Sequence, residues 1–364
     1  MCGIIGIVGN RDAAPLIVDA LKRLEYRGYD SAGVATVDGG ELTRRRAVGK
    51  LNMLADLVAS EPIKGSIGIG HTRWATHGAP TTANAHPHQA GRVAVVHNGI
   101  IENYRALRDE LRAAGRNFET DTDTEIIAQL CAHLMQGGLE PQDAAAATLA
   151  RLEGAFALCF LFEGQDDLIV AARRGSPLAI GYGDGEMFVG SDALALAPLT
   201  NRIAYLEEGD WAVLRRSGVQ VHDAGGTPVE RTVRTISVDN VLVDKGAHRH
   251  FMAKEIHEQP MVAGYAASAY IDSARSRITS PAEVLDFAAM DRITLVGCGT
   301  AFYACLTAKY WFEQLAQMPV EVDIASEFRY REPPITPRTV ALFVSQSGET
   351  ADTLAALRYC KGKA

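Results

Sequence analysis

The first ten residues constrain this chain most, because a cysteine directly follows the initiator methionine and an apolar, glycine-containing stretch follows the cysteine. Once Met1 is removed, Cys2 carries a thiol and a free α-amino group, which titrate near ~8.5 and ~7.7–8.0 and exchange protons readily around neutral pH. An N-terminal nucleophile that uses its own amine as base is a known form of covalent catalysis. The apolar residues 3–8 predict a buried strand that fixes this terminus. Taken alone, these residues also fit an incidental cysteine at a frayed end.

Composition restricts the class of protein. A chain of 364 residues predicts two or three domains, and 47% hydrophobic with 22% charged residues is ordinary for a globular protein. No apolar run reaches the ~20 residues of a membrane helix, and we expect no secretory leader. A net charge of −8 without a Lys/Arg block argues against nucleic acid as the main partner. The six scattered cysteines, never spaced as Cys-x-x-Cys, indicate a reducing cytoplasm without structural zinc.

Apolar periodicity predicts a layered first part of the chain. Helical spacing occurs over residues 11–25, 102–114 and 126–135, with short strands at 34–37, 67–70 and 92–96. From residue 154 to about 221 the pattern changes to short apolar strands separated by turns, which is typical of antiparallel sheets. We therefore expect the first ~235 residues to form two sheets between helical layers.

The periodicity changes again after a polar linker over residues 237–250 and a helical segment at 251–260. From residue 291 apolar strands alternate with helices, the strands being 292–296, 320–324 and 340–344. This alternation predicts a parallel α/β sheet. Three such strands followed by a terminal helix leave an unpaired sheet edge, so we expect this domain to be truncated.

Two polar loops carry candidate binding residues. Arg73 can hold a carboxylate through two parallel charge-assisted hydrogen bonds, and Trp74 beside it can act as a wall or lid. Asp123 can hold a cationic amine, while Asp121 or Thr122 caps the helix that follows. A third polar loop, at residues 26–33, is dense in glycine, charge and aromatic residues, as functional loops often are. A solvated turn with one salt bridge is the alternative for this loop.

Four histidines lie close together in the sequence and raise the question of a metal: His71, His77, His86 and His88. No carboxylate or cysteine stands at ligand spacing beside them. We therefore expect no metal, and a structural role for some of these histidines.

Asn98 and Gly99 follow the strand at 92–96 and offer a side-chain amide and an exposed backbone N–H. Such a pair can form an oxyanion hole, where the loss of one donor costs ~10²–10³ in rate. The same dipeptide is also the strongest short hairpin signal. Taken alone, it favours the hairpin.

Several motifs occur together in one order, at residues 2–4, 26–33, 71–78, 97–103 and 122–125. As a set they resemble the N-terminal-nucleophile glutamine amidotransferases, and most closely the branch that makes glucosamine 6-phosphate from fructose 6-phosphate. The resemblance implies an α+β domain with the four-layer αββα N-terminal-nucleophile hydrolase fold.

The resemblance also implies roles for individual residues. Cys2 would attack the side-chain amide of glutamine, and Asn98 with Gly99 would hold the oxyanion. The residues implied to bind glutamine are Arg73, Thr76 and His77 at the α-carboxylate, Asp123 at the α-ammonium, Arg27 at the closed pocket, Trp74 at the ammonia path, and His86.

A serine-rich turn over residues 345–350 precedes the last predicted helix. Free N–H groups and the dipole at a helix N-terminus favour a phosphate there, although N-capping by Ser345, Ser347 or Thr350 is an alternative. The segment resembles a sugar isomerase (SIS) domain, which implies sugar-phosphate contacts from Thr300, Ser345, Gln346, Ser347 and Thr350. Ala301 departs from the serine often found in bacterial members, which leaves one phosphate contact open.

These expectations combine into one hypothesis. Residues 1–236 form the glutaminase domain, 237–285 a linker and connecting helix, and 286–364 a partial SIS domain. The resemblance implies that glutamine and fructose 6-phosphate are the substrates, that no cofactor is needed, and that the full-length protein is a homodimer. Composition and charge indicate a cytoplasmic protein without a nucleic-acid or membrane partner. This piece of the protein is expected to keep only the glutaminase half-reaction.

Two other classes remain open at this stage. An amidophosphoribosyltransferase would join the same glutaminase to a phosphoribosyl-pyrophosphate loop with paired acidic residues, and the turn at 345–350 argues against it. A non-catalytic sugar-phosphate sensor would need neither Cys2 at the terminus nor Arg73, Asn98 and Asp123 in this order.

Overall fold

The structure is a computed structural model that describes residues 2–25, 30–74, 78–235, 248, 250–272, 277–278, 289–346, 348 and 350–362. The chain divides into two compact units, Met1–Asp244 and Lys245–Ala364, and each is described by itself. Among the described residues, no helix combines the length and apolar character that crossing a bilayer requires.

The first unit contains two antiparallel sheets. The eight-stranded sheet has the order β15 (Arg234–Thr235), β11 (Arg202–Tyr205), β9 (Ala179–Tyr182), β10 (Met187–Gly190), β1 (Gly3–Val8), β4 (Ile67–Arg73), β2 (Ser31–Asp38) and β3 (Glu41–Val48). The seven-stranded sheet has the order β14 (Pro228–Val229), β13 (Gly218–His222), β12 (Trp211–Arg215), β8 (Ile169–Arg174), β7 (Gly154–Phe162), β6 (Val93–Ile101) and β5 (His88–Ala90).

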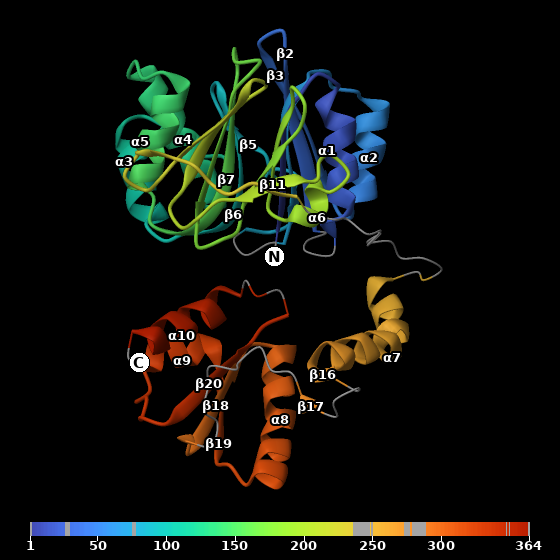
Figure 1. The fold of residues 1–364 in the computed structure, drawn as a ribbon. Helices are drawn as coiled ribbons and strands as arrows, with labels where there is room; N and C mark the ends of the chain where they lie inside the picture. Colours follow the sequence, from blue (N-terminus) through green and yellow to red (C-terminus); the bar gives the residue numbers. More distant parts are fainter. Residues whose placement is uncertain are drawn as a thin grey trace. The chain divides into compact units, whose positions relative to one another are not determined.

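Helices cover the outer faces of both sheets (Figure 1). Against the eight-stranded sheet lie α1 (Ala13–Lys22), α2 (Leu51–Ser60) and the short α6 (Ala193–Leu196). Against the seven-stranded sheet lie α4 (Thr124–Gln136) and α5 (Pro141–Arg151), and α3 (Tyr104–Ala113) packs against α4 in the same layer. Three apolar clusters fill the spaces between these layers, one between the sheets and one under each helical layer. The predicted four-layer α+β fold is therefore confirmed.

Strand β1 lies in the middle of its sheet, between β10 and β4, and all six of its residues are buried. Apolar side chains on both faces of the strand explain this position. Ile5 and Ile7 pack under the α1 layer, whereas Ile4 and Val8 pack between the two sheets. A Cβ on Gly3 would lie 2.7 Å from the Leu24 side chain, so only glycine fits there. This strand holds the N-terminus at a defined place, as the sequence predicted.

The Asn98-Gly99 dipeptide does not form a hairpin, which corrects the interpretation that the dipeptide alone favours. Strand β6 continues through both residues, which pair with Ala157 and Phe156 of β7. Gly99 has a φ of +125°, and a Cβ there would lie 2.0 Å from the Ala155 carbonyl oxygen. Glycine is required here by strand pairing and not by a turn.

Other local expectations also differ from the structure. The N-cap of α4 is Asp123, without a side-chain cap bond, and neither Asp121 nor Thr122 holds that position. The periodicity did not indicate β3, α2 or α5. Strand β3 is a polar edge strand with mostly half-exposed side chains, so it lacks an apolar alternation.

The second unit begins with α7 (Phe251–Tyr270) and a short pair of strands, β16 (Ile271–Asp272) and β17 (Arg277–Ile278). A parallel three-stranded sheet follows, in the order β19 (Val320–Ile324), β18 (Arg292–Gly297) and β20 (Thr339–Val344). Its helices are α8 (Thr300–Ala316), α9 (Ala325–Arg331) and α10 (Ala351–Lys361). The predicted parallel α/β sheet is confirmed, and the carboxyl ends of β18 and β20 lie at one edge.

Candidate active site

Cys2 lies directly before β1, beside the end of β4. The register pairs Gly3 with Thr72, which brings the cysteine next to the chain that leaves β4. The backbone N–H of Trp74 donates to Cys2 Sγ over 3.2 Å, and the Trp74 carbonyl oxygen lies 3.5 Å from the same sulfur. The thiol is half-buried and held by the main chain of a neighbouring strand end.

Asn98 reaches the same residue from the other sheet. Its Nδ2 donates to the Cys2 carbonyl oxygen over 3.1 Å, and its Oδ1 lies 3.0 Å from Nε2 of His71. Gly99, the next residue of β6, is exposed. The structure therefore brings the nucleophile candidate and the oxyanion candidates together, because β1 and β6 approach each other from the two facing sheets.

Arg73 ends β4 and is 3% exposed. Its Nη2 donates to the Gly78 carbonyl oxygen over 3.1 Å and its Nη1 to that of Ala79 over 3.3 Å. Its Nη1 also lies 4.0 Å from Oδ1 of Asp30. The guanidinium is thus fixed one residue from Trp74, where a substrate carboxylate could meet it.

Asp123 is 5% exposed, and its Oδ2 accepts a hydrogen bond from the Ile101 backbone N–H over 2.8 Å. This bond ties the start of α4 to the end of β6, two residues beyond Gly99. One carboxylate oxygen is therefore used in anchoring the strand. The assignment of this carboxylate to the substrate ammonium stays a prediction.

The electrostatic setting of Cys2 limits its reactivity in the absence of a base. Burial raises the pKa of the thiol, the Trp74 N–H and the Arg73 charge act in the opposite direction, and the charge of Asp30 raises it further. A thiol with a raised pKa is mostly protonated at neutral pH, so it needs a group that accepts its proton. The α-amine that Cys2 gains on loss of Met1 is such a group.

Behind the site lies a buried histidine cluster, made of His71, His86, His88 and His97. The rings of His71 and His86 stack at 4.1 Å, and His88 meets His86 edge-on at 4.7 Å. Nε2 of His86 and Nδ1 of His97 both lie 3.0 Å from Oγ1 of Thr124. Burial lowers the pKa of His71 to about 3, and also lowers the pKa values of His86 and His88.

These rings pack among one another and against Thr124 of α4. Among the described residues, no group of three His, Cys, Asp or Glu side chains is arranged to hold a metal ion. His86, which the resemblance assigns to glutamine binding, is 5% exposed and lies within this cluster. The hydrogen bond between His71 and Asn98 could not be predicted from the sequence. The one available signal was that His71 stands two residues before Arg73, in the same motif.

Four predicted site residues lie outside the described residues: Arg27, Thr76, His77 and Ser347. Their assignments stay predictions. Trp74 and Gly78, the described residues on either side of residues 75–77 in the sequence, both contact the site described above.

In the second unit, the predicted phosphate residues lie where the parallel strands end. Oγ of Ser345 accepts from the Gly348 backbone N–H over 3.0 Å and lies 3.1 Å from Oγ1 of Thr350. Thr350 is the N-cap of α10 but makes no side-chain cap bond. Thr300 opens α8 after β18, and Gln346 is exposed. A side-chain cap bond from Thr350, one form of the capping alternative, is therefore not observed.

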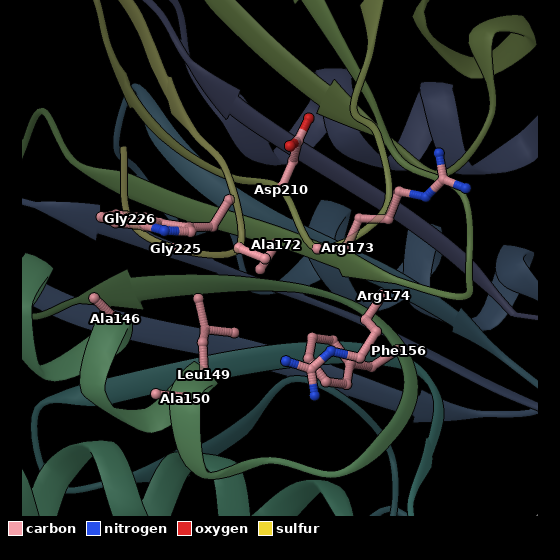
Figure 2. A pocket seen from close by; sticks show the side chains of 13 residues that line it. Ala146, Leu149, Ala150, Phe156, Ala172, Arg173, Arg174, Asp210, Gly225 and Gly226 are labelled. Carbon is pink, nitrogen blue, oxygen red and sulfur yellow. The ribbon is translucent and has the colours of Figure 1, made fainter. Parts of the chain in front are cut away.

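A separate cavity of about 220 Å³ lies between α5 and the strands β7, β8 and β12 (Figure 2). Its charged side chains have partners within the protein. Arg174 donates to the Leu152 carbonyl oxygen over 2.7 Å. Its guanidinium group lies beside Phe156 (Figure 2), 5.1 Å from the centre of the ring. Asp210 forms two hydrogen bonds, of 2.7 and 2.8 Å, with Arg231. None of the described residues that line it belongs to the predicted site.

The chain is similar to known families and solved structures. The family profile of a glutamine amidotransferase domain matches residues 71–198, and that of a SIS domain matches residues 286–364. The fold resembles the allosteric regulatory enzyme of purine biosynthesis, with a TM-score of 0.53 and 28% identity over 61% of this chain and 49% of that one. It also resembles glutamine phosphoribosylpyrophosphate amidotransferase from B. subtilis, with a TM-score of 0.55 and 20% identity over 88% of this chain and 65% of that one.

The chain therefore combines a glutamine amidotransferase domain, which has the N-terminal-nucleophile hydrolase fold, with a SIS domain. Along its whole length the chain is 59% identical to glutamine–fructose-6-phosphate aminotransferase (isomerizing) of Brucella suis biovar 1, of which it covers 60%. The enzymes of the same name from Mesorhizobium japonicum and Caulobacter vibrioides are 59% and 57% identical over 99% and 100% of this chain, and 60% of each is covered. The chain is a relative of these isomerising aminotransferases and spans about 60% of their length.

Proposed function

We propose that this protein releases ammonia from glutamine at Cys2 and transfers it to fructose 6-phosphate, which gives glutamate and glucosamine 6-phosphate. The names of its relatives support this reaction, as does the order of the two domains. The observation that carries the proposal is the pair of N–H donors around the terminal residue. Trp74 N–H lies 3.2 Å from the Cys2 sulfur, and Nδ2 of Asn98 lies 3.1 Å from the Cys2 carbonyl oxygen.

The first half-reaction can be written with these groups. The Cys2 α-amine takes the thiol proton as Sγ forms a bond to the carbonyl carbon of the glutamine amide. Negative charge develops on the amide oxygen, and the amide of Asn98 and the N–H of Gly99 stabilise it. The amine then returns the proton to the leaving nitrogen, ammonia departs, and a thioester remains. Water hydrolyses the thioester, which releases glutamate and restores the thiol.

Binding of the substrate uses the remaining groups. Arg73 holds the α-carboxylate and Asp123 the α-ammonium, so both ends of a free amino acid are recognised. Because both groups are almost fully buried, their charges act in a medium of lower dielectric constant than water. Trp74 is assigned to the route by which ammonia leaves, and its 48% exposure beside the nucleophile supports this assignment.

The sugar phosphate is assigned to the turn between β20 and α10 and to the start of α8. Thr350 leaves the first-turn N–H groups of α10 without a side-chain cap bond, and such groups bind phosphate well. Thr350→Val should weaken the binding of fructose 6-phosphate, measured by calorimetry, and leave glutamine hydrolysis unchanged. Unchanged binding of fructose 6-phosphate would contradict the assignment.

A cytoplasmic setting is consistent with the six cysteines, which are all free thiols. The homodimer implied by the resemblance stays a prediction. The test of the proposed function is the release of glutamate and ammonia from glutamine by the chain after Met1 has been removed. If such a preparation releases neither glutamate nor ammonia, the glutaminase half of the proposal is wrong.

A further inference from the structure

The imidazole of His71 lies directly behind the candidate oxyanion residue. Its Nε2 is 3.0 Å from Oδ1 of Asn98 and 3.0 Å from the carbonyl oxygen of His97. The ring belongs to β4, in the eight-stranded sheet, whereas both oxygens belong to β6, in the seven-stranded sheet. One ring nitrogen therefore bridges the two sheets at the residue that faces Cys2.

These contacts fix the position of the ring proton. A carbonyl oxygen can only accept a hydrogen bond, so the nitrogen that faces His97 must carry hydrogen. Burial keeps the pKa of His71 near 3, and the neutral ring therefore carries one proton, on Nε2. Its Nδ1 is buried without a hydrogen-bond partner among the described atoms. The ring is thus a neutral imidazole that donates only from Nε2.

The same proton determines which way the Asn98 amide points. The two ends of a side-chain amide are alike in shape, and the hydrogen-bond partners decide their orientation. Because Nε2–H of His71 is a donor, the Asn98 atom facing it must be the oxygen. The amide nitrogen then points to Cys2, where it donates to the carbonyl oxygen over 3.1 Å.

The ring itself is held against rotation. His71 is fully buried, and its ring stacks on that of His86 at 4.1 Å with 27° between the planes. Nε2 of His86 is in turn 3.0 Å from Oγ1 of Thr124 at the first position of α4. The donor that orients Asn98 is therefore fixed by α4 as well as by β4.

We propose that His71 is a positioning residue for glutamine hydrolysis, which holds the Asn98 amide so that its N–H groups face Cys2, where negative charge develops on the amide oxygen of glutamine. This inference rests on the proposed function. His71 touches neither substrate nor nucleophile in this scheme, and it acts only through Asn98. Its loss should therefore lower kcat, where oxyanion stabilisation is expressed, more than it changes KM.

The test compares two substitutions of His71 with one matched control, all in the complete chain. In His71→Gln, the side-chain NH₂ can take the place of Nε2–H. In His71→Leu, no donor remains. His88→Leu removes another buried histidine of the cluster, one that bonds Thr122 and not Asn98. Thermal melts of all three variants measure the cost of each change to the fold.

Loss of the donor leaves the half-buried Asn98 amide oxygen without this partner, so His71→Leu should lower kcat by about ten- to a hundredfold with KM within about threefold. His71→Gln should recover most of that loss. His88→Leu should lower the melting temperature about as much as His71→Leu while kcat stays within about threefold of the parent value. An equal loss of kcat in His88→Leu, or no rescue by glutamine, would overturn the inference.

A double-mutant cycle separates this inference from the proposed function. In an Asn98→Ala background, His71→Leu should have almost no further effect on kcat, because its only route to the chemistry has been removed. Losses that multiply in the double variant would show that His71 acts elsewhere, and would overturn the inference alone. If Asn98→Ala by itself leaves kcat unchanged, the oxyanion assignment in the proposed function also fails.

Discussion

The side-chain amide of Asn98 donates to the main-chain carbonyl oxygen of Cys2 over 3.1 Å, and so joins a strand of the seven-stranded sheet to the residue that precedes β1 of the eight-stranded sheet. This bond places a donor beside the candidate nucleophile before any substrate arrives. Donors fixed in advance need no reorganisation when charge develops on the substrate, which is why they lower the barrier.

Replacement of this donor should affect chemistry and not binding. We predict that Asn98→Ala lowers kcat for glutamine hydrolysis by about two to three orders of magnitude and leaves KM within a few-fold. Charge on the amide oxygen develops only during attack, so the interaction belongs to the transition state. Steady-state kinetics with a thermal melt provide the measurement. A lower melting temperature with a parallel loss of activity would instead mean that Asn98 only supports the strand.

Arg73 should behave in the opposite way, because the substrate carboxylate carries its charge throughout the reaction. A hydrogen bond to a charged group contributes ~1.5–3 kcal/mol, so Arg73→Ala should raise KM for glutamine by roughly ten- to a hundredfold or more, mainly without loss of kcat. Initial rates over a wide range of glutamine concentration measure both constants.

The control for Arg73 comes from a neighbour that holds the same loop. Nδ2 of Asn84 donates to the Ala79 carbonyl oxygen over 3.1 Å, the oxygen that Arg73 also contacts. Asn84→Ala therefore loosens the loop without removing the cation, and its KM should rise much less than that of Arg73→Ala. Equal KM values in the two variants would show that the arginine supports the loop only. Loss of kcat at unchanged KM in Arg73→Ala would contradict its assignment.

The buried histidines predict an acid-sensitive fold. Burial lowers the pKa of His71 to about 3, against about 6.5 in an unfolded chain, and also lowers those of His86 and His88. The unfolded chain then binds more protons than the folded one below about pH 6.5, so stability rises with pH in that range. The stabilisation is complete above about pH 6.5 and is lost as the pH falls towards about 3.

Each such histidine contributes up to ~1.4 kcal/mol of unfolding free energy per pH unit within this window. Thermal melts between about pH 4.5 and 8 measure the effect. His71→Gln removes one titrating ring, so its melting temperature should depend less on pH below about 6.5 than that of the parent chain. The same pH dependence in both chains would contradict this account of the cluster.

Most of the fold could be predicted from the sequence, because its strands either alternate apolar with polar residues or are continuously apolar. Strand β1 is buried on both faces, and its Ile-rich pattern showed this directly. The polar edge strand β3 carried no such signal, because its side chains do not pack into the core and therefore need not be apolar. Asn98-Gly99 misled local reasoning because glycine suits a hairpin as well as a close approach to Ala155, and only the pairing with β7 distinguishes them.

The candidate site was predictable where a residue contributes its own chemistry, as Cys2 and Arg73 do. It was less predictable where one residue acts through another. In the sequence, His71 belongs to a group of histidines for which we expected no metal and a structural role for some members. Its bond to Asn98 depends on how the two sheets face each other. Asp30, 4.0 Å from Arg73, is likewise a partner that only the folded chain brings near.

Cys2 differs from the other cysteines of the chain in the base that is available to its thiol. Cys131, Cys159 and Cys305 are buried, and burial raises their pKa values, that of Cys131 to about 12. Such thiols carry almost no thiolate at neutral pH. Cys2 alone among the six would have its own α-amine as a base, once Met1 is lost.

The most direct test is mass spectrometry of the chain after reaction with a diazoketone analogue of glutamine, an electrophile that alkylates a thiol at the glutamine site. The account predicts a chain that lacks Met1 and carries one adduct, on the peptide that begins at Cys2. It also predicts that Cys2→Ala neither takes up the label nor hydrolyses glutamine. An adduct on another cysteine, or labelling that persists in Cys2→Ala, would contradict the assignment of Cys2 as the nucleophile.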